Sequence, residues 1–369
     1  MLTPINVSMK EKSIKELRYG WTTGACATAA TKAALTAFFS EEFPDPVTIT
    51  LPRGQTPAFA LATEEKGADF SRASIIKDAG DDPDVTHLAR VISTVRRGTA
   101  GSGIRFQAGE GVGTVTKEGL PISVGEAAIN PVPRQMMTEV VTEIIREFGE
   151  SPDIEIEIGI ENGEELARHT MNGRLGIVGG LSVLGTTGIV VPYSCASWIA
   201  SIHRGIDVAR ANNLTHLAAS TGSTSEKAVA AIYDLPETAL LDMGDFAGGV
   251  LKYLKKHPVP HLTIAGGFAK ITKLAQGHMD LHSGRSRVDF NWLADQLATL
   301  GADRKLMEMT REANTAMQVL QYSREAELSL ADLVAKRAKE VASDIAGGAV
   351  MINILIFDRS GHLVGRSDG

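Results

Sequence analysis

Apolar and polar residues alternate most clearly at 153–160, where DIEIEIGI has isoleucine at every second position. A period of two predicts a strand that is buried on one face. A helix is predicted to begin near Thr22 or Thr23 and to run through ACATAATKAALTAF, because threonine caps helices and alanine favours their propagation. A second helix is expected near 134–148, and shorter strands at 47–51, 59–63, 73–77 and 104–108. This mixture without strict alternation predicts an α+β N-terminal domain.

In the second half of the chain, predicted strands and helices alternate. Strands are expected at 215–220, 238–243, 261–266 and 350–357. Helices are expected at 197–212, 224–233, 246–257, 289–300, 304–322 and 328–346. This order predicts an α/β domain with a mostly parallel sheet that is covered by helices. The pattern changes near Pro192, so the predicted domains are 1–192 and 193–369.

Composition narrows the function classes. The 369 residues carry a net charge of −7, and no basic stripe with interleaved aromatic residues is visible, which argues against a non-specific nucleic-acid binder. Two cysteines exclude a disulfide framework and a zinc ribbon. No apolar core of a signal peptide precedes Leu17, and the apolar run 175–191 is short for a bilayer span and holds five glycines. A cytoplasmic enzyme without a membrane partner is therefore expected.

The run 109–134, GEGVGTVTKEGLPISVGEAAINPVPR, combines five glycines with three prolines. Glycine lets the backbone turn or approach another group closely, and proline stiffens the same loop. Such a loop is typical of a ligand site, although it can also be a structured connection. We favour the ligand interpretation and expect substrate contacts at Glu110, Gly111, Gly113 and Arg134.

The predicted helix start at Thr22, Thr23 and Gly24 is a second candidate for binding an anion. Helix N-termini present N–H groups and a positive dipole end. The simpler alternative is an ordinary threonine N-cap. Cys26 lies in the same first turns, where the pKa of a thiol can fall, but a small buried cysteine is the better interpretation.

Four carboxylates gather in KDAGDDPDVTH, at Asp78, Asp81, Asp82 and Asp84. They could hold a divalent ion or supply a base, and they could equally cap a helix that starts near Asp84. The spacing does not match an EF-hand loop. In the capping alternative, His87 falls in the first turn of that helix and could face the same site.

Glycine turns follow three predicted strands of the second half. The first turn contains Thr221, Gly222, Ser223 and Thr224, and Asp242 closes the next strand about 20 residues later. Gly244 follows Asp242, and Gly266 and Gly267 follow the third strand. In doubly wound folds a glycine turn approaches the ligand and an acid on the next strand binds ribose hydroxyls. These residues therefore predict a site for an adenosine-containing cofactor, although TGST is not a GxGxxG fingerprint.

The segment HMDLHSGRSR contains His278, Asp280 and His282. Two histidines and an aspartate could bind zinc or iron, but the spacing does not match HExxH, and we expect no metal site. His282 is instead a candidate for a polar contact or for proton transfer near the cofactor. A solvated loop is the alternative.

Five of these segments together resemble the cobalt-precorrin-5B C1-methyltransferase family of the anaerobic cobalamin pathway. They are LRYGWTTGACATAATKAAL at 17–35, KDAGDDPDVTH at 77–87, the run 109–134, NGRLGIVGGLSVLGTTGIV at 172–190 and IAGGFAKITKLAQGHMDLHSGRSRVDF at 264–290. The resemblance covers about three-quarters of the chain. It implies methyl transfer from S-adenosylmethionine to C1 of a cobalt-containing tetrapyrrole, and a Rossmann-like second domain.

The implied reaction gives the candidate residues their roles. A net proton is lost, so His282 or Asp81 could act as a weak base. An acidic protein must bind a polycarboxylate through local N–H groups and selected cations, which suits the helix start at Thr22–Gly24, Arg134 and the glycine loop. A second glycine wall that could bind the substrate in the same way consists of Gly179, Gly180, Gly185, Thr186 and Thr187. The alternative is that these residues only pack tightly.

Two other function classes stay open at this point. One is a nucleotide-dependent phosphotransferase or dehydrogenase, although no GxxxxGK[ST] motif is present. The other is a non-catalytic carrier of a cobalt tetrapyrrole. A homo-oligomer is also left open. We further expect Gly113→Val to impair substrate use more than stability.

Overall fold

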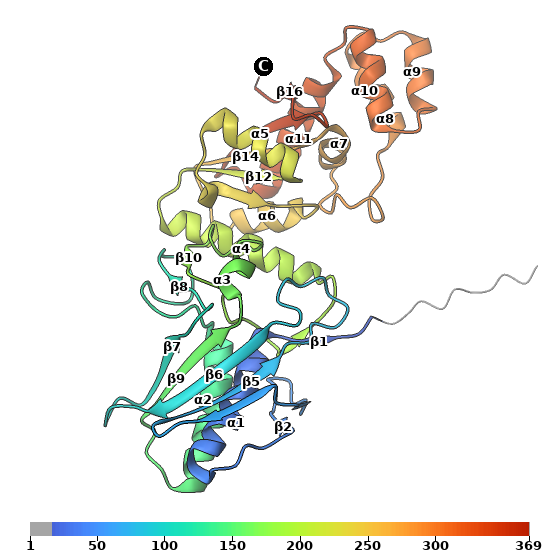
Figure 1. The fold of residues 1–369 in the computed structure, drawn as a ribbon. Helices are drawn as coiled ribbons and strands as arrows, with labels where there is room; N and C mark the ends of the chain where they lie inside the picture. The colour runs from blue at the N-terminus through green and yellow to red at the C-terminus, as the bar shows by residue number, and fades with distance from the viewer. Residues whose placement is uncertain (1–16, 369) are drawn as a thin grey trace, which may run out of the picture. The chain divides into compact units, whose positions relative to one another are not determined.

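The computed structural model describes residues 17–368 as two compact units (Figure 1). The first unit contains residues 17–112, 129–166 and 183–193, and the second contains 113–128, 167–182 and 194–368. The last crossing, after Tyr193, falls where the sequence pattern changes. Two segments before it, 113–128 and 167–182, nevertheless pack with the second unit. We call these two segments the excursions.

A five-stranded sheet forms the centre of the first unit, in the order β4-β5-β6-β9-β7. Only β7 and β9 are parallel; the other pairs are antiparallel. In β9 the four isoleucines are fully buried, with Glu155 and Glu157 between the first three, which confirms the predicted strand. The strands are β4 (Thr63–Lys66), β5 (Phe70–Ile76), β6 (Arg90–Arg97), β7 (Ile104–Ala108) and β9 (Ile154–Ile160).

Helix α1 (Thr23–Ser40) contacts α2 (Pro131–Phe148) and strands β5 and β6. Its buried residues are mostly alanine, which lets the helix approach its neighbours closely. The hydroxyls of Thr28 and Thr31 donate to carbonyls four residues earlier, at 2.8 Å each, so these buried polar groups are satisfied. The unit also contains β1 (Gly20–Trp21), β2 (Val47–Thr48), β3 (Ala58–Phe59), β11 (Ile189–Val190) and most of α3 (Gly163–Ala167).

The helix predicted to start near Asp84 is wrong. One oxygen of Asp84 accepts from the Thr86 N–H at 2.7 Å, which closes a tight turn. Leu88 has φ 64°, a left-handed conformation that no helix contains, and its N–H donates to the Lys77 carbonyl. The chain then enters β6, whose β-branched residues favour a strand. The aspartates therefore mark the loop between β5 and β6, not the start of a helix.

The second unit is built on a five-stranded sheet in the order β13-β12-β14-β15-β16. The first four strands are parallel, and β16 is antiparallel to β15. The predicted mostly parallel sheet is therefore confirmed. The strands are β12 (His216–Ser220), β13 (Leu240–Asp242), β14 (His261–Gly267), β15 (Met351–Phe357) and β16 (Leu363–Arg366).

Helices cover both faces of this sheet. Val229 of α5 (Ser223–Tyr233) packs on one face with Ala218, whereas Leu217 and Ala219 join the larger core under α6 (Ala247–Leu254), α7 (Phe268–Ala275) and α11 (Leu330–Ala346). Successive strand residues thus point to opposite faces. The remaining elements are α4 (Cys195–Ala211), the 3₁₀ turn Glu237–Ala239, α8 (Phe290–Thr299), α9 (Arg304–Arg311) and α10 (Ala316–Glu325).

The structure departs from the predicted elements at several points. The helix expected at 304–322 is two helices, because Thr315 caps α10 by accepting from the Gln318 N–H. Helix α7 and strand β16 were not predicted. The apolar run 175–191 contains only β11 and β10 (Ile177–Val178), which pairs with β8 (Thr114–Val115) in the excursions. No helix within 17–368 is long and apolar enough to cross a membrane.

The strand order fixes where a ligand would bind. β12 lies between β13 and β14, so the chain moves to one side of β12 through α5 and to the other side through α6. In open parallel sheets, ligands bind at the carboxyl ends of the strands where this reversal occurs. In this unit that edge contains Ser220, Asp242 and Gly267. We call the loops that follow these three residues the carboxyl rim.

Candidate functional site

The loops of the carboxyl rim are joined by backbone hydrogen bonds. The N–H groups of Met243 and Gly244 donate to the Ser220 carbonyl at 3.0 and 3.2 Å. The Thr221 N–H donates to the Ala265 carbonyl at 2.9 Å. The turn after β13 is therefore bonded to the end of β12, and the turn after β12 is bonded to β14.

Two glycines of the rim leave space for a ligand. Gly222 and Gly267 are the N-cap residues of α5 and α7. A Cβ atom added to either glycine would meet nothing within 4 Å, so a bound group could approach the backbone at these two points. By contrast, Gly266 is packed, because its Cβ would lie 2.8 Å from Thr221 Oγ1. Gly244 has φ 56°, which favours glycine.

Asp242 is the acid that ends β13 at the rim. Burial raises the pKa of its carboxyl, and the nearby Glu226 raises it further. Arg174, the Gly244 N–H and Lys270 act in the opposite direction but do not cancel the rise. The backbone carbonyl of Asp242 accepts from the indole of Trp198 at 3.0 Å, which ties α4 to the end of β13.

Two further polar groups of the rim escaped the sequence analysis. Ser220 is 1% exposed, and its hydroxyl finds no hydrogen-bond partner among residues 17–368. Lys270 donates to the Thr221 carbonyl at 2.9 Å and lies 3.0 Å from Asp245 Oδ1. An orphaned buried hydroxyl beside an open turn suits a polar ligand.

The structure brings the predicted cofactor residues together. They follow three neighbouring strands of one sheet, and Ser223 and Thr224 begin α5 with exposed side chains. The set is Thr221, Gly222, Ser223, Thr224, Asp242, Gly244, Gly266 and Gly267. Arg174, Glu226 and Lys270 were not predicted as site residues. No motif marks Glu226 or Lys270, and Arg174 reaches the start of α5 from an excursion that is far away in sequence.

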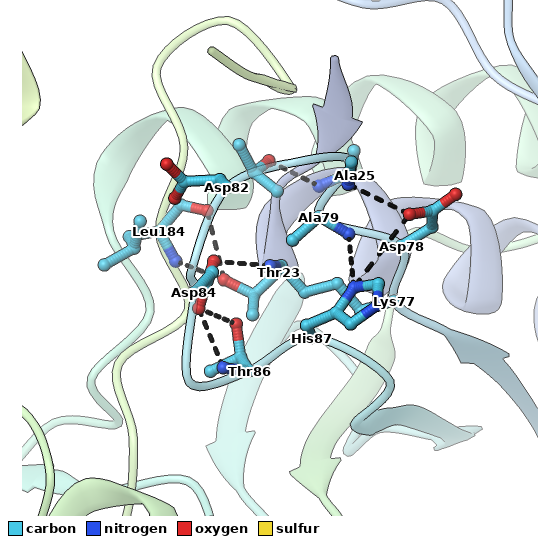
Figure 2. Close-up of polar contacts among 12 residues, drawn as sticks. Thr23, Ala25, Lys77, Asp78, Ala79, Asp82, Asp84, Thr86, His87 and Leu184 are labelled. Atoms are coloured by element: carbon cyan, nitrogen blue, oxygen red, sulfur yellow. Dashed lines mark hydrogen bonds and ion pairs between the residues drawn. The ribbon is translucent and has the colours of Figure 1, made fainter. Parts of the chain in front are cut away.

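The acidic loop of the first unit is cross-linked internally (Figure 2). Lys77 is 1% exposed, and its ammonium donates to Asp84 at 2.6 Å. The guanidinium of Arg18 holds Asp78 at two points and, with the Gly80 N–H, lowers the pKa of that carboxyl to about 2. His87 Nδ1 accepts from the Ala79 N–H at 3.1 Å.

The other two aspartates of this loop also contact backbone groups. Asp81 accepts from the Arg18 N–H at 2.7 Å and donates its own N–H to the Arg18 carbonyl at 2.9 Å. Asp82 accepts from the Tyr193 N–H at 2.8 Å. Within residues 17–368, no three His, Cys, Asp or Glu side chains gather as a metal site would need. The four carboxylates thus fix the loop to the chain segments around it.

The start of α1 is occupied by the chain itself. The Gly24 N–H donates to the Leu184 carbonyl at 3.0 Å, and the Ala25 N–H donates to the Thr22 hydroxyl at 3.2 Å. The Thr23 hydroxyl accepts from the Leu184 N–H at 3.0 Å. All three predicted residues, Thr22, Thr23 and Gly24, are buried. These contacts favour the N-cap interpretation over an open anion site.

Cys26 lies in the first turns of α1 and is fully buried. Burial raises the pKa of its thiol to about 12, which confirms the interpretation as a small core residue.

The glycines of the run 109–134 serve packing. An added Cβ would lie 2.0 Å from the Ile160 carbonyl at Gly111 and 2.5 Å from Ile177 Cγ2 at Gly113. Glu110 is exposed. Arg134 is half-buried, donates to the Ile129 carbonyl at 2.8 Å and lies over the ring of Phe106. The structured connection is thus the better description of the two glycines.

The second glycine wall does not form one surface within either unit. Gly179 and Gly180 belong to the second unit, whereas Gly185, Thr186 and Thr187 belong to the first. Gly185 packs against Thr22, because its Cβ would lie 2.3 Å from the Thr22 hydroxyl oxygen. Tight packing, the alternative stated for this wall, explains Gly185.

His282 lies in an exposed loop of the second unit. Its ring Nδ1 accepts from the Gly284 N–H at 3.1 Å, and its backbone N–H donates to the Asp280 carboxylate at 3.0 Å. Asp280 also pairs with Arg285 at 2.5 Å. With Nδ1 accepting, a neutral His282 carries its proton on Nε2. In this arrangement Nε2 can donate a hydrogen bond, and the lone pair of Nδ1 is already used within the loop.

Comparison with known proteins identifies the family. The profile of the CbiD family matches residues 10–192, and that of the CbiD C-terminal domain matches residues 280–368. A curated protein of Brucella anthropi, named cobalt-precorrin-5B C(1)-methyltransferase, is 58% identical over 97% of both chains. A protein of the same name from Paramagnetospirillum magneticum is 57% identical over 95% of this chain and 98% of its own.

One solved structure was also found, the cobalamin biosynthesis protein (cbiD) from Archaeoglobus fulgidus. It is 27% identical, with a TM-score of 0.39, and the match covers 68% of this chain and 77% of that one. The identity to the curated relatives, which extends over almost the whole chain, is sufficient for assignment. The chain belongs to the CbiD family.

Proposed function

We propose that this protein methylates C1 of cobalt-precorrin-5B to give cobalt-precorrin-6A, with S-adenosylmethionine as the methyl donor. The observation that carries the proposal is the 58% identity, over nearly the full length, to a relative named for this methyl transfer. The carboxyl rim supports it, because it offers an acid and open glycine turns at the position where α/β sheets bind adenosine-containing ligands.

The residues of the rim fit such a donor. Asp242 would accept from the ribose hydroxyls, as acids at the end of the second strand do in Rossmann-like folds. The backbone at Gly222 and Gly267 has room for close approach, and the buried Ser220 hydroxyl lacks a partner that a ligand could supply. A nucleotide-dependent enzyme of another class would use the same edge, so donor binding must be tested directly.

When bound, S-adenosylmethionine supplies an electrophilic methyl group on a positively charged sulfur. The transfer neutralises that charge, so the protein needs no strong acid. Its residues act by alignment and by exclusion of water, which can supply most of the acceleration. This accounts for the lack of a nucleophile motif in the sequence.

The net loss of a proton leaves a role for a weak base. Of the two predicted bases, His282 holds its proton on Nε2 while Nδ1 accepts from the Gly284 N–H. Asp81 retains an acceptor carboxylate, one oxygen of which binds the Arg18 N–H. We therefore propose Asp81 before His282 as the group that receives the proton.

Contacts to the polycarboxylate substrate are also proposed within the first unit. Among the predicted contacts, Thr22, Thr23, Gly24 and Gly111 bond or pack within this unit. Gly113 belongs to the second unit and packs there against Ile177. Arg134 is the predicted cation of this unit; it is half-buried and lies over the ring of Phe106. The exposed Glu110 also stays a proposed contact. An arginine matches the geometry of a carboxylate well.

Asp242→Ala is expected to weaken the binding of S-adenosylhomocysteine by about 10- to 100-fold, because a charged hydrogen bond contributes about 1.5–3 kcal/mol. Titration calorimetry measures the affinity, and circular dichroism checks the fold. Asp295→Asn is the control, because that exposed carboxylate of α8 pairs only loosely with Arg311 at 3.7 Å. Unchanged affinity in Asp242→Ala would remove Asp242 from the site.

A further inference from the structure

An ion pair connects the second excursion to the start of α5. Arg174 donates from both terminal nitrogens to the two oxygens of Glu226, at 2.8 and 2.7 Å. The side chains are 26% and 16% exposed, so water screens this pair only in part. Glu226 lies in the first turn of α5, directly after the open turn at Gly222. The pair therefore stands at the carboxyl rim.

The excursions have other attachments that do not involve the rim. Lys117 donates to the Thr238 hydroxyl at 2.5 Å, near the amino end of β13. Asn212 donates to the Glu118 carbonyl at 3.0 Å, and a Cβ on Gly119 would lie 2.6 Å from the Asp207 carbonyl. These contacts hold the first excursion on the second unit, and the pairing of β8 with β10 joins the second excursion to the first. Docking alone therefore does not account for a two-point arginine pair at the start of α5.

The charges that act on Asp242 come from three elements. Glu226 comes from α5, Arg174 from the excursion and Lys270 from α7. The carboxylates of Asp242 and Glu226 repel each other, and an arginine that binds Glu226 relieves part of the repulsion. Arg174 in turn interacts with both acids, because Glu226 and Asp242 each raise the pKa of its guanidinium.

We propose that Arg174 and Glu226 form a positioning pair for the methyl-donor site, in which the two-point contact neutralises Glu226 at the start of α5 and leaves the Asp242 carboxylate to bind the donor's ribose. This inference rests on the proposed function. It assigns a role in donor binding to an excursion that the chain inserts between two segments of the first unit. Neither residue contacts the donor in this account; both act through Asp242.

The two halves of the pair have opposite electrostatic effects on Asp242. Glu226 raises the pKa of the Asp242 carboxyl and Arg174 lowers it. Donor affinity needs the ionised carboxylate, so it falls as the pH falls through that pKa. Arg174→Met should move this loss of affinity to higher pH, whereas Glu226→Gln should move it to lower pH. A purely structural pair would give two variants that behave alike, since each breaks the same contact.

The experiment titrates S-adenosylhomocysteine into the full chain by calorimetry between pH 4.5 and 8, with circular dichroism at each pH. Arg174→Met is expected to raise the midpoint of the acid loss, Glu226→Gln to lower it, and Asp242→Asn to abolish it. Lys117→Met, which cuts another attachment of the excursions, should leave the midpoint unchanged. Arg174→Lys keeps the charge and should return the midpoint close to that of the wild type.

Suppose that the wild type binds S-adenosylhomocysteine normally. If the pH midpoints of Arg174→Met and Glu226→Gln then move in the same direction, or if neither moves, the inference is overturned and the proposed function stays intact. A wild-type chain that binds no S-adenosylhomocysteine at any pH would overturn the proposed function itself, and the inference with it. If Arg174→Met does not fold, Glu226→Gln and Arg174→Lys still decide between the two accounts.

Discussion

Replacing Lys77 with methionine is expected to lower the free energy of unfolding by about 3–5 kcal/mol. Lys77 is 1% exposed and is bound to Asp84 at 2.6 Å. Burial by itself would raise the pKa of the Asp84 carboxyl, but Lys77 and Thr86 outweigh it and lower that pKa. Without the ammonium, a largely buried carboxylate loses its counter-charge, and the loop between β5 and β6 loses its anchor. Urea unfolding followed by circular dichroism measures the loss.

The matched control for Lys77→Met is the double variant Lys77→Met/Asp84→Asn. An asparagine oxygen can still accept from the Thr86 N–H, as the aspartate does at 2.7 Å. Because the uncompensated charge is gone, the double variant should regain a large part of the stability that the single variant loses. A single variant as stable as the wild type would contradict the account of this loop.

Gly111→Ala is expected to cost about 2–5 kcal/mol of stability. The backbone there has φ 75°, which costs an alanine about 1–2 kcal/mol. Its Cβ would also lie 2.0 Å from the Ile160 carbonyl, a contact that the backbone must relieve by shifting, at about 1–3 kcal/mol. Thermal unfolding of the purified variant tests this expectation.

Gly125→Ala is the matched control for Gly111→Ala. Gly125 lies in the same run with φ 91°, but its Cβ would meet nothing within 4 Å. It should therefore cost only about 1–2 kcal/mol. Equal losses in the two variants would show that packing at Gly111 is not the cause.

By the same reasoning, Gly113→Val should impair stability before substrate use, contrary to the expectation from sequence, because Ile177 Cγ2 lies 2.5 Å from the position of an added Cβ.

Regular periodicity made much of the fold predictable from sequence. The alternating isoleucines predicted the strand β9, because a strand places every second residue on the buried face. The alanine-rich sequence predicted the helix α1, because alanine favours helices. The alternation of strands and helices after Pro192 likewise predicted the parallel sheet and the edge at which its turns meet. The candidate cofactor residues followed from that order, because the carboxyl ends of parallel strands share one edge.

What failed depended on side-chain and backbone contacts that a local sequence pattern does not record. The helix expected after Asp84 is a turn because Lys77 and Thr86 bind that carboxylate. The glycines at 111 and 113 resemble a ligand loop, but backbone atoms fill the space beside them. Arg174 could not be linked to Glu226, 52 residues away, because single-sequence patterns do not record which surface an inserted segment covers.

A crystal structure of the full chain with S-adenosylhomocysteine tests the central claim most directly. The account predicts the ribose against Asp242 and the adenosyl group beside the backbone of Gly222 and Gly267, on the carboxyl rim of the second unit. An adenosyl group seated elsewhere, with this rim left unchanged by the ligand, would contradict the site proposed here.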